Sequence, residues 1–177
     1  MSVPAGRRKQ SRFEAEHHYY KLRQEVTELM LLDFGFSMEK YMRQLEKYRN
    51  AHASDPAVDE ITARWKKKAD AFYRWFIDKE CDAVLEMLRH IECEFTAGNS
   101  IYPSDTAARV GEYCQRRQHI NEAIAGCYVL KQEINYIIRT LPVDINKFKR
   151  FATLIDEQVA LYKGVRSADN KFLKTGK

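Results

Sequence analysis

Glycine, proline and long hydrophobic runs are all scarce in this sequence. The 177 residues include seven Gly and four Pro, which disfavours turn-rich β architectures and favours long helices. No run of about 18 apolar residues occurs, so we expect no transmembrane helix. The first ten residues are polar and basic, unlike a secretory signal. We therefore expect a soluble, cytoplasmic protein.

Motifs of catalysis and of metal binding are also missing. The four cysteines stand singly, without a CxxC pair, and we expect reduced, buried thiols rather than zinc ligands; they are Cys81, Cys93, Cys114 and Cys127. His17 and His18 are adjacent, so they point to different sides of a helix. No Gly-rich phosphate loop and no Ser/His/Asp set is visible. We expect no enzymatic activity, no metal and no cofactor.

The composition predicts one folded domain with basic ends. Apolar residues make up 45% of the chain and aromatic residues 12%, enough for a real core. Residues 1–12 and 163–177 each carry a charge of +4, so the net charge of +5 leaves −3 for residues 13–162. We divide the chain into a basic arm (1–12), one helical-bundle domain (13–166) and a basic tail (167–177). Basic arms suit polyanion partners and also serve as solubilising tails.

Apolar stripes with helical spacing predict the helices. The first runs over about 13–33 and is interrupted at Phe34-Gly35-Phe36, since Gly readily takes positive φ. Ser37 is a suitable N-cap for a second segment that ends near residue 50. Asp55-Pro56 then starts a helix with a stop signal at Gly98-Asn99. Its stripe breaks near Lys79-Glu80, so it either spans some 40 residues or kinks in the middle.

Two further helices complete the pattern. One occupies about 104–141 and ends at Pro142, and the last begins after Asp144. Short links between long stripes imply antiparallel neighbours. We predict an all-α fold, an antiparallel four-helix bundle with an additional helical segment (about 37–71) inserted between the first and second bundle helices. Whether this segment packs on the bundle or projects from it stays open.

Clusters of basic residues are the candidate functional sites. We select eight of them: Arg116, Arg117, Arg139, Lys147, Lys149, Arg150, Lys163 and Arg166. Antiparallel packing around the turn at Pro142 should bring Arg116/Arg117 level with Lys163/Arg166. Lysines at a helix start oppose the helix dipole, which hints at another use for Lys147 and Lys149. A second cluster, Lys66–Lys68 with Arg74, and the arms are the fallback sites. A solvated face and a phosphate-binding face both fit these clusters.

Three stretches of the chain resemble a known family, over residues 20–34, 85–99 and 117–169. The best of them contains Ile120-Asn121-Glu122-Ala123, Asn135-Tyr136-Ile137-Ile138-Arg139 and Leu161-Tyr162-Lys163. These stretches are similar to the four-helix-bundle family of the accessory variability determinant of diversity-generating retroelements and of proteins encoded within 23S ribosomal RNA intervening sequences. In this chain some 35 residues, about 37–71, replace the family's short entry to its second helix.

The resemblance implies a non-enzymatic partner of a reverse transcriptase. It also implies a ring-like homopentamer that binds RNA or DNA and supports mutagenic cDNA synthesis. The alternative is a helical oligomerisation or adaptor protein without nucleic-acid contact. An enzyme using a helix-borne carboxylate/His site is the least supported of the three.

Overall fold

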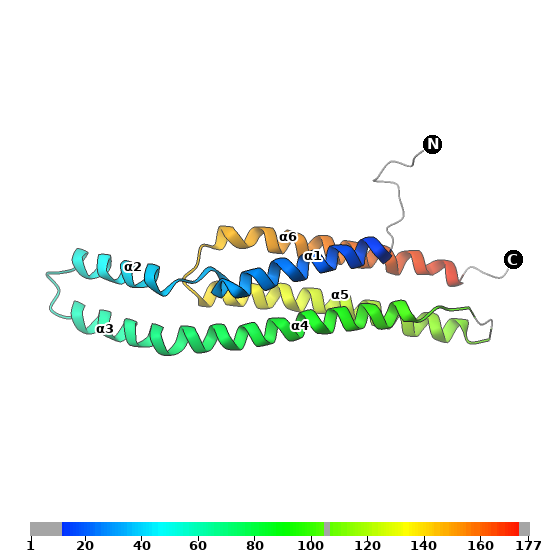
Figure 1. Cartoon of the computed structure of the whole chain (residues 1–177), viewed down its shortest axis with the longest axis horizontal. Helices are drawn as coiled ribbons and strands as arrows, with labels where there is room; N and C mark the ends of the chain where they lie inside the picture. Colours follow the sequence, from blue (N-terminus) through cyan, green and yellow to red (C-terminus); the bar gives the residue numbers. More distant parts are fainter. Residues whose placement is uncertain (1–11, 105–106, 174–177) are drawn as a thin grey trace, which may run out of the picture.

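The protein is an all-α bundle, seen here in a computed structural model that describes residues 12–104 and 107–173. Four long helices form its body: α1 (Arg12–Leu31), α4 (Arg74–Ser100), α5 (Arg109–Thr140) and α6 (Lys149–Ala168). Two shorter helices, α2 (Met38–Ala51) and α3 (Val58–Lys68), lie between α1 and α4 in the chain (Figure 1). The described residues form no strand. The predicted fold class is confirmed.

The four body helices form a closed antiparallel ring. Helix α4 packs on α5, α5 on α6, α6 on α1 and α1 on α4, so each helix buries its apolar stripe against two neighbours. Three rings stack at the centre: Tyr162 lies between Tyr19 and Phe95. The Tyr19 hydroxyl donates to the Leu88 carbonyl, which satisfies a polar group inside the core. Burial raises the pKa of both tyrosines above the usual range.

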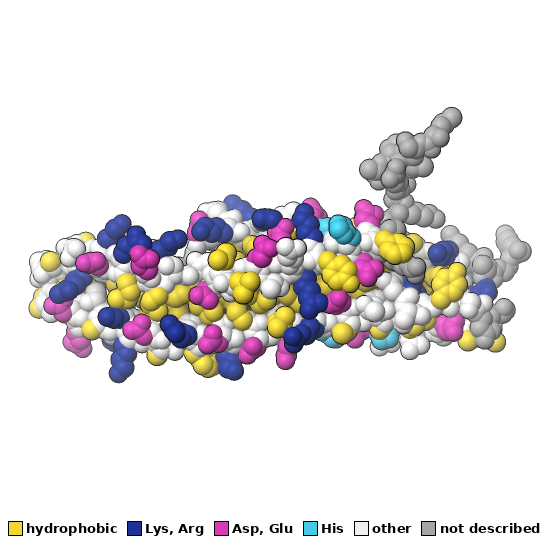
Figure 2. Space-filling model, viewed as in Figure 1, with side chains coloured by type: hydrophobic (Ala, Val, Ile, Leu, Met, Phe, Trp, Pro, Cys, Tyr) yellow, Lys and Arg dark blue, Asp and Glu magenta, His cyan; other side chains and the backbone are white. Residues whose placement is uncertain are grey.

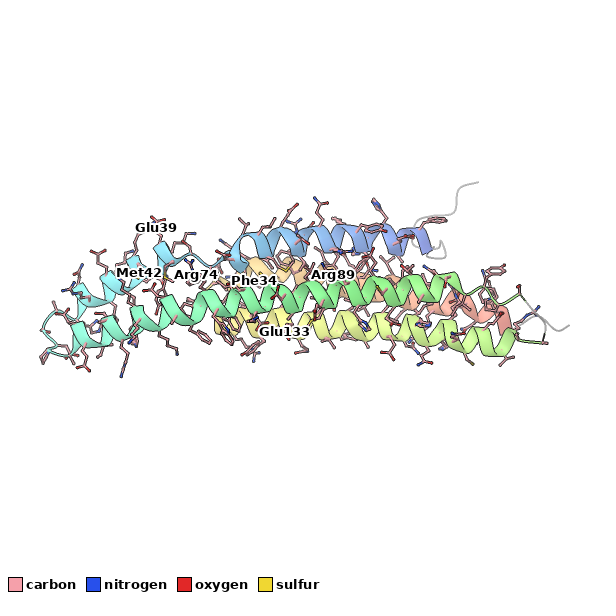
Figure 3. All side chains as sticks on the ribbon, turned by 60° about the horizontal axis from the view of Figure 1, so that its bottom comes forward. Phe34, Glu39, Met42, Arg74, Arg89 and Glu133 are labelled. Carbon is pink, nitrogen blue, oxygen red and sulfur yellow. The ribbon has the colours of Figure 1, made fainter. Side chains whose placement is uncertain are left out.

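The predicted interruption after α1 is a tight turn anchored by a buried ring. A short 3-10 segment, η2 (Asp33–Gly35), contains three residues with positive φ, of which Gly35 (φ 76°) is the natural occupant. Phe34 adopts φ 54° and is fully buried between α1 and α4 (Figure 3), so core packing stabilises its unusual backbone. Ser37 then caps α2 by accepting from the Lys40 amide, as predicted.

The inserted segment projects from the bundle. Helices α2 and α3 form a hairpin that continues the long axis of the molecule beyond α1, α5 and α6 (Figure 1). Helix α3 passes through a π-helical segment, η3 (Ala69–Tyr73), directly into α4, so one nearly continuous helix joins hairpin and bundle.

The long helix is irregular at a different place from the one predicted. Residues 79–80 are regular α-helix, and at the break in the apolar stripe Glu80 interacts with Glu133 of α5. The irregularity lies in η3, where π-helical turns shift the helix face. As a result, Tyr73 contacts Phe36 and Tyr41 of the hairpin base, while Phe72 stacks on Phe76 of the bundle.

The C-terminal region differs from its predicted boundary. A 3-10 segment, η4 (Ile145–Phe148), is capped by Asp144 and precedes α6. After α6, a further 3-10 segment, η5 (Asp169–Leu173), packs on α5, and Asp169 is buried. Residues 167–173 therefore belong to the fold and not to a tail. Residues 1–11 of the basic arm and 174–177 of the tail lie outside the described residues. Among the described helices, none is long and apolar enough to cross a membrane.

Candidate nucleic-acid interface

Arg116 is a structural residue and not an exposed charge. Its side chain is buried, with 8% of its surface exposed, and its Nε donates to Oδ2 of Asp169 at 2.7 Å. Its Nη1 donates to the carbonyls of Gly98 (2.7 Å) and Ile101 (3.1 Å), and its Nη2 to Oδ1 of Asn99 (3.2 Å). Arg116 thus joins α5, η5 and the end of α4. The prediction that it is available to a phosphate is wrong.

The remaining basic residues of this region meet where α5 and α6 run side by side. Three contacts fix the antiparallel register: Arg117 with Asn170, Arg166 with Asn121, and Lys163 with Tyr128. Arg117 and Asn121 are four residues apart, about one helical turn. Arg166 therefore lies about one turn from the level of Arg117, whereas Lys163 contacts Tyr128, eleven residues or about 16 Å further along α5. The expected shared level holds for Arg166 and not for Lys163. We call Arg117, Lys131, Lys163 and Arg166 the cationic seam.

Neutral groups hold three of the four seam cations. Arg117 Nη1 donates to the Tyr113 hydroxyl at 2.9 Å and to Asn170 Oδ1 at 3.3 Å. Arg166 Nη1 donates to Asn121 Oδ1 at 2.7 Å, and Lys163 Nζ donates to the Tyr128 hydroxyl at 2.8 Å. These contacts orient the cations without cancelling their charge, and each cation keeps further N–H groups to donate.

Only the fourth cation of the seam pairs with a carboxylate among the described residues. Lys131 Nζ donates to both oxygens of Asp156 at 2.7 Å. Tyr128 lies beside this pair along α5, with 44% of its surface exposed and the Lys163 ammonium 5.4 Å from its ring centre. The seam thus combines net positive charge with one exposed aromatic ring, a pairing that can contact phosphate and base together.

The other predicted site residues lie at the far end of the α5–α6 pair. Arg139, Lys147 and Lys149 are exposed, and Lys149 lines a small cavity of about 130 Å³ between the two helices. Arg150, by contrast, is directed toward α1, where its Nη2 lies 2.5 Å from Oε1 of Glu25. The structure therefore brings Arg139, Lys147 and Lys149 together at one end of the bundle and separates Arg150 from them.

The fallback cluster belongs to the projecting hairpin. Lys66, Lys67 and Lys68 are exposed on α3, and Arg74 is exposed at the start of α4. Lys66 lines a groove between α2 and α3, and the Lys68 ammonium stands 5.9 Å from the Phe72 ring centre. Along the long axis of the molecule, these residues lie far from the α5 segment that contains Arg117, so they form a separate basic region (Figure 1).

The cysteines and histidines take mainly structural positions. Cys127 is buried, Cys81 is half-buried, and Cys93 and Cys114 are exposed, so the prediction of buried thiols is wrong for the last two. His18 bridges Gln158 and Glu157 of α6, and His119 contacts Glu94 of α4 at 2.8 Å. Within the described residues, no three His, Cys, Asp or Glu side chains are grouped so as to hold a metal ion.

Sequence reasoning missed the residues that orient the seam cations. Tyr113, Asn121, Tyr128 and Asn170 are the acceptors, and Lys131 adds a cation. A signal was present: positions 117, 121, 128 and 131 have spacings of four, seven and three, which place them on one face of α5. Their partners come from another helix, so the pairing itself requires the fold.

No family model, no curated protein and no solved structure matches this chain in comparisons of sequence and structure.

Proposed function

We propose that this protein is a non-enzymatic, nucleic-acid-binding accessory protein of a reverse transcriptase. The cationic seam on α5 and α6 contacts the phosphate backbone of RNA or DNA, and Lys149, Lys147 and Arg139 extend the contact toward the end of the bundle. The template RNA or its cDNA in a diversity-generating retroelement is the proposed ligand, following the family resemblance of residues 117–169.

One observation carries the nucleic-acid part of this proposal. Within the part of the chain that the structure describes, hydroxyl and amide oxygens instead of carboxylates hold Arg117, Lys163 and Arg166. A cation whose partner is neutral keeps its full charge for an incoming anion, whereas an exposed ion pair is already neutralised and contributes little. Phosphate contacts of this kind bind with little dependence on base sequence.

Binding of fluorescent RNA and DNA tests the seam directly. The variant is Lys163→Ala/Arg166→Ala, which removes two charges from the α6 side of the seam. The matched control is Lys79→Ala/Arg89→Ala, which removes two charges from exposed positions of α4; Arg89 projects on the α1 side of α4 (Figure 3). We expect the seam variant to weaken binding at least about tenfold at low salt, and the control to bind like wild type.

Two results would contradict this assignment. Wild-type protein that binds neither RNA nor DNA at about 50 mM salt, a concentration at which phosphate contacts are strong, favours the adaptor function. Equal losses in the seam variant and the α4 control would mean that only net charge matters, and would move the site to Lys66–Lys68 or the basic arms.

Two observations test the proposed reverse transcriptase partner: the identity of the neighbouring genes and co-purification of the two proteins. A neighbouring gene for a reverse transcriptase, together with template and variable repeats, is expected. Co-purification of that enzyme with this protein, in ribonuclease-treated extract, would support a direct contact. Absence of such a neighbour would contradict the retroelement part and leave nucleic-acid binding as a separate question.

A homo-oligomer without nucleic acid is the second candidate. Its support is an exposed apolar strip on α4 and α5, where Trp75 (56% exposed), Tyr136 (54%) and Val129 (52%) face outward. Such rings and side chains are typical of protein interfaces. Light scattering tests it: the resemblance implies a pentamer, five times 20.8 kDa, and a monomer at micromolar concentration would contradict both the family assignment and the interface.

A further inference from the structure

The α2–α3 hairpin is two helices thick, and no third element of residues 12–104 and 107–173 packs over it (Figure 1). Its helices touch through rings on one side, where Tyr48 packs on Trp65 (5.1 Å between ring centres) and Tyr41 on Tyr73 (5.5 Å). The other side is a groove of about 680 Å³, and Figure 2 shows hydrophobic side chains gathered along the line where α2 and α3 meet. Two helices cannot enclose a core, whereas four can.

The floor of this groove is apolar and small. Met42 points from α2 toward α3 (Figure 3), and Leu45 and Ala63 lie beside it. Leu45 is buried within the hairpin, and Ala63 leaves room for a neighbouring helix to approach. A helix with a similar narrow apolar stripe would fit this floor, and α2 itself has such a stripe.

The rim of the groove is charged but has no net charge. Three acidic and three basic residues line it: Glu39, Glu46, Asp59, Arg43, Arg49 and Lys66. Such a rim does not attract a polyanion, in contrast to the cationic seam. Its charges also alternate along α2, in the order Glu39, Arg43, Glu46, Arg49.

Within one chain, Glu39 pairs with Arg43 and Asp59 with Arg49, each at 2.7 Å and exposed to solvent. Such exposed pairs contribute little stability, so they can exchange partners at little cost. The alternation along α2 is complementary to itself when it is reversed. If two copies of α2 lie antiparallel about a two-fold axis near residue 44, Glu39 faces Arg49 of the second copy. In the same register, Arg43 stands beside Glu46 of the second copy, within about one residue's rise of 1.5 Å. Each attractive pair occurs twice, as two-fold symmetry requires. We propose that two copies of this protein dimerise through their α2–α3 hairpins, which then form an intermolecular four-helix bundle.

The register makes a specific prediction about charge reversal. Arg43→Glu alone places a glutamate against Glu46 of the second copy, and Glu46→Arg alone places an arginine against Arg43 of the second copy; each like-charge contact occurs twice. Each single variant should dimerise about tenfold more weakly, since two like-charge contacts form across the axis. An equimolar mixture of the two single variants should form a heterodimer of wild-type strength, because both contacts are then attractive.

Sedimentation velocity and native mass spectrometry on the full chain, without nucleic acid, test this proposal. The control is Lys47→Glu, the same charge reversal on α2 at an exposed position outside the groove, and it should associate like wild type. If the bundle also self-associates, the single variants should reduce the mass of the wild-type assembly and the mixture should restore it. Circular dichroism and thermal unfolding confirm that each variant is folded.

Three results would overturn the dimer: a wild-type protein that does not associate, a Lys47→Glu variant that loses as much association as Arg43→Glu, or a mixture that associates no better than its parts. The proposal is independent of nucleic-acid binding. Lys163→Ala/Arg166→Ala should dimerise normally, so failure of one proposal is distinguishable from failure of the other.

Discussion

The chemical type of a residue in this bundle does not show whether its side chain is buried and structural or exposed. Arg116 and Arg117 are adjacent in sequence, yet one is buried and bonded to four oxygen acceptors while the other is half-buried at the surface. Residue type and spacing place both arginines on the same helix and cannot tell which of them is buried. The difference depends on Asp169, which lies 53 residues further along the chain.

Arg116→Ala should destabilise the protein by about 3 kcal/mol, because it leaves the buried Asp169 carboxylate unpaired. Arg117→Ala should cost less than about 1 kcal/mol, as expected for a partly exposed polar contact. Urea unfolding of the two variants makes the comparison. Similar free energies of unfolding would show that Arg116 is not the structural link between α5 and η5.

Gly126 allows α4 and α5 to approach closely. A Cβ added there would stand 2.7 Å from Cγ1 of Ile91, whereas one added at Gly111, on the same helix, would meet nothing within 4 Å. Gly126→Ala should therefore destabilise by about 1–3 kcal/mol, and Gly111→Ala should stabilise by about 0.5–1 kcal/mol. Thermal unfolding checks both, and a stabilising Gly126→Ala would mean that the two helices lie further apart than described.

Helix α4 and helix α5 also meet through two carboxyl groups. Glu133 of α5 lies beside α4 (Figure 3), and burial, a hydrogen bond with Glu133 and the charge of Glu133 together raise the pKa of Glu80 from 4.5 to about 7. A raised carboxyl pKa means that the folded state holds its proton more tightly than the unfolded chain does. This stability is fully present below about pH 4.5 and is lost as the pH rises through about 7.

Glu133→Gln should remove the repulsion and reduce this pH dependence. At pH 8 the variant should melt at a higher temperature than wild type, and at pH 5 the difference between the two melting temperatures should be smaller. Glu86→Gln, an exposed substitution on α4, is the control and should change neither value. Parallel melting curves for Glu133→Gln and wild type between pH 5 and 8 would contradict the coupling.

The helices were largely predictable from the sequence, because apolar spacing and capping residues are local signals. Apolar stripes at helical spacing indicated the four bundle helices, and the caps at Ser37 and Asp144 form as expected. Helix ends shifted by a few residues: α4 runs past Gly98 to Ser100, and Gly98 lies inside the helix, where an added Cβ would stand 3.2 Å from the Arg116 carbonyl oxygen. The π segment was not predictable, since no local signal marks it and Tyr73 contacts rings that lie outside its own helix.

The whole molecule divides its charge between two regions with different character. The hairpin groove is lined by equal numbers of acidic and basic residues in a self-complementary order, whereas the cations of the α5–α6 seam have mainly neutral partners. The sequence indicated which residues are basic and that α5 and α6 would bring Arg166 near the level of Arg117. It could not indicate that Arg116 turns inward and that Arg150 pairs with Glu25 on α1, because those choices depend on the packing of other helices.

The dependence of duplex DNA binding on salt tests the central claim most directly. Each phosphate that a protein cation neutralises contributes about 0.9 to the slope of log Kobs against log salt concentration. Lys163→Ala/Arg166→Ala should therefore reduce the slope by about 1.8 per seam engaged, while Lys79→Ala/Arg89→Ala should leave it unchanged. An unchanged slope in the seam variant, or an equal reduction in the α4 control, would show that the α5–α6 seam does not contact the phosphate backbone.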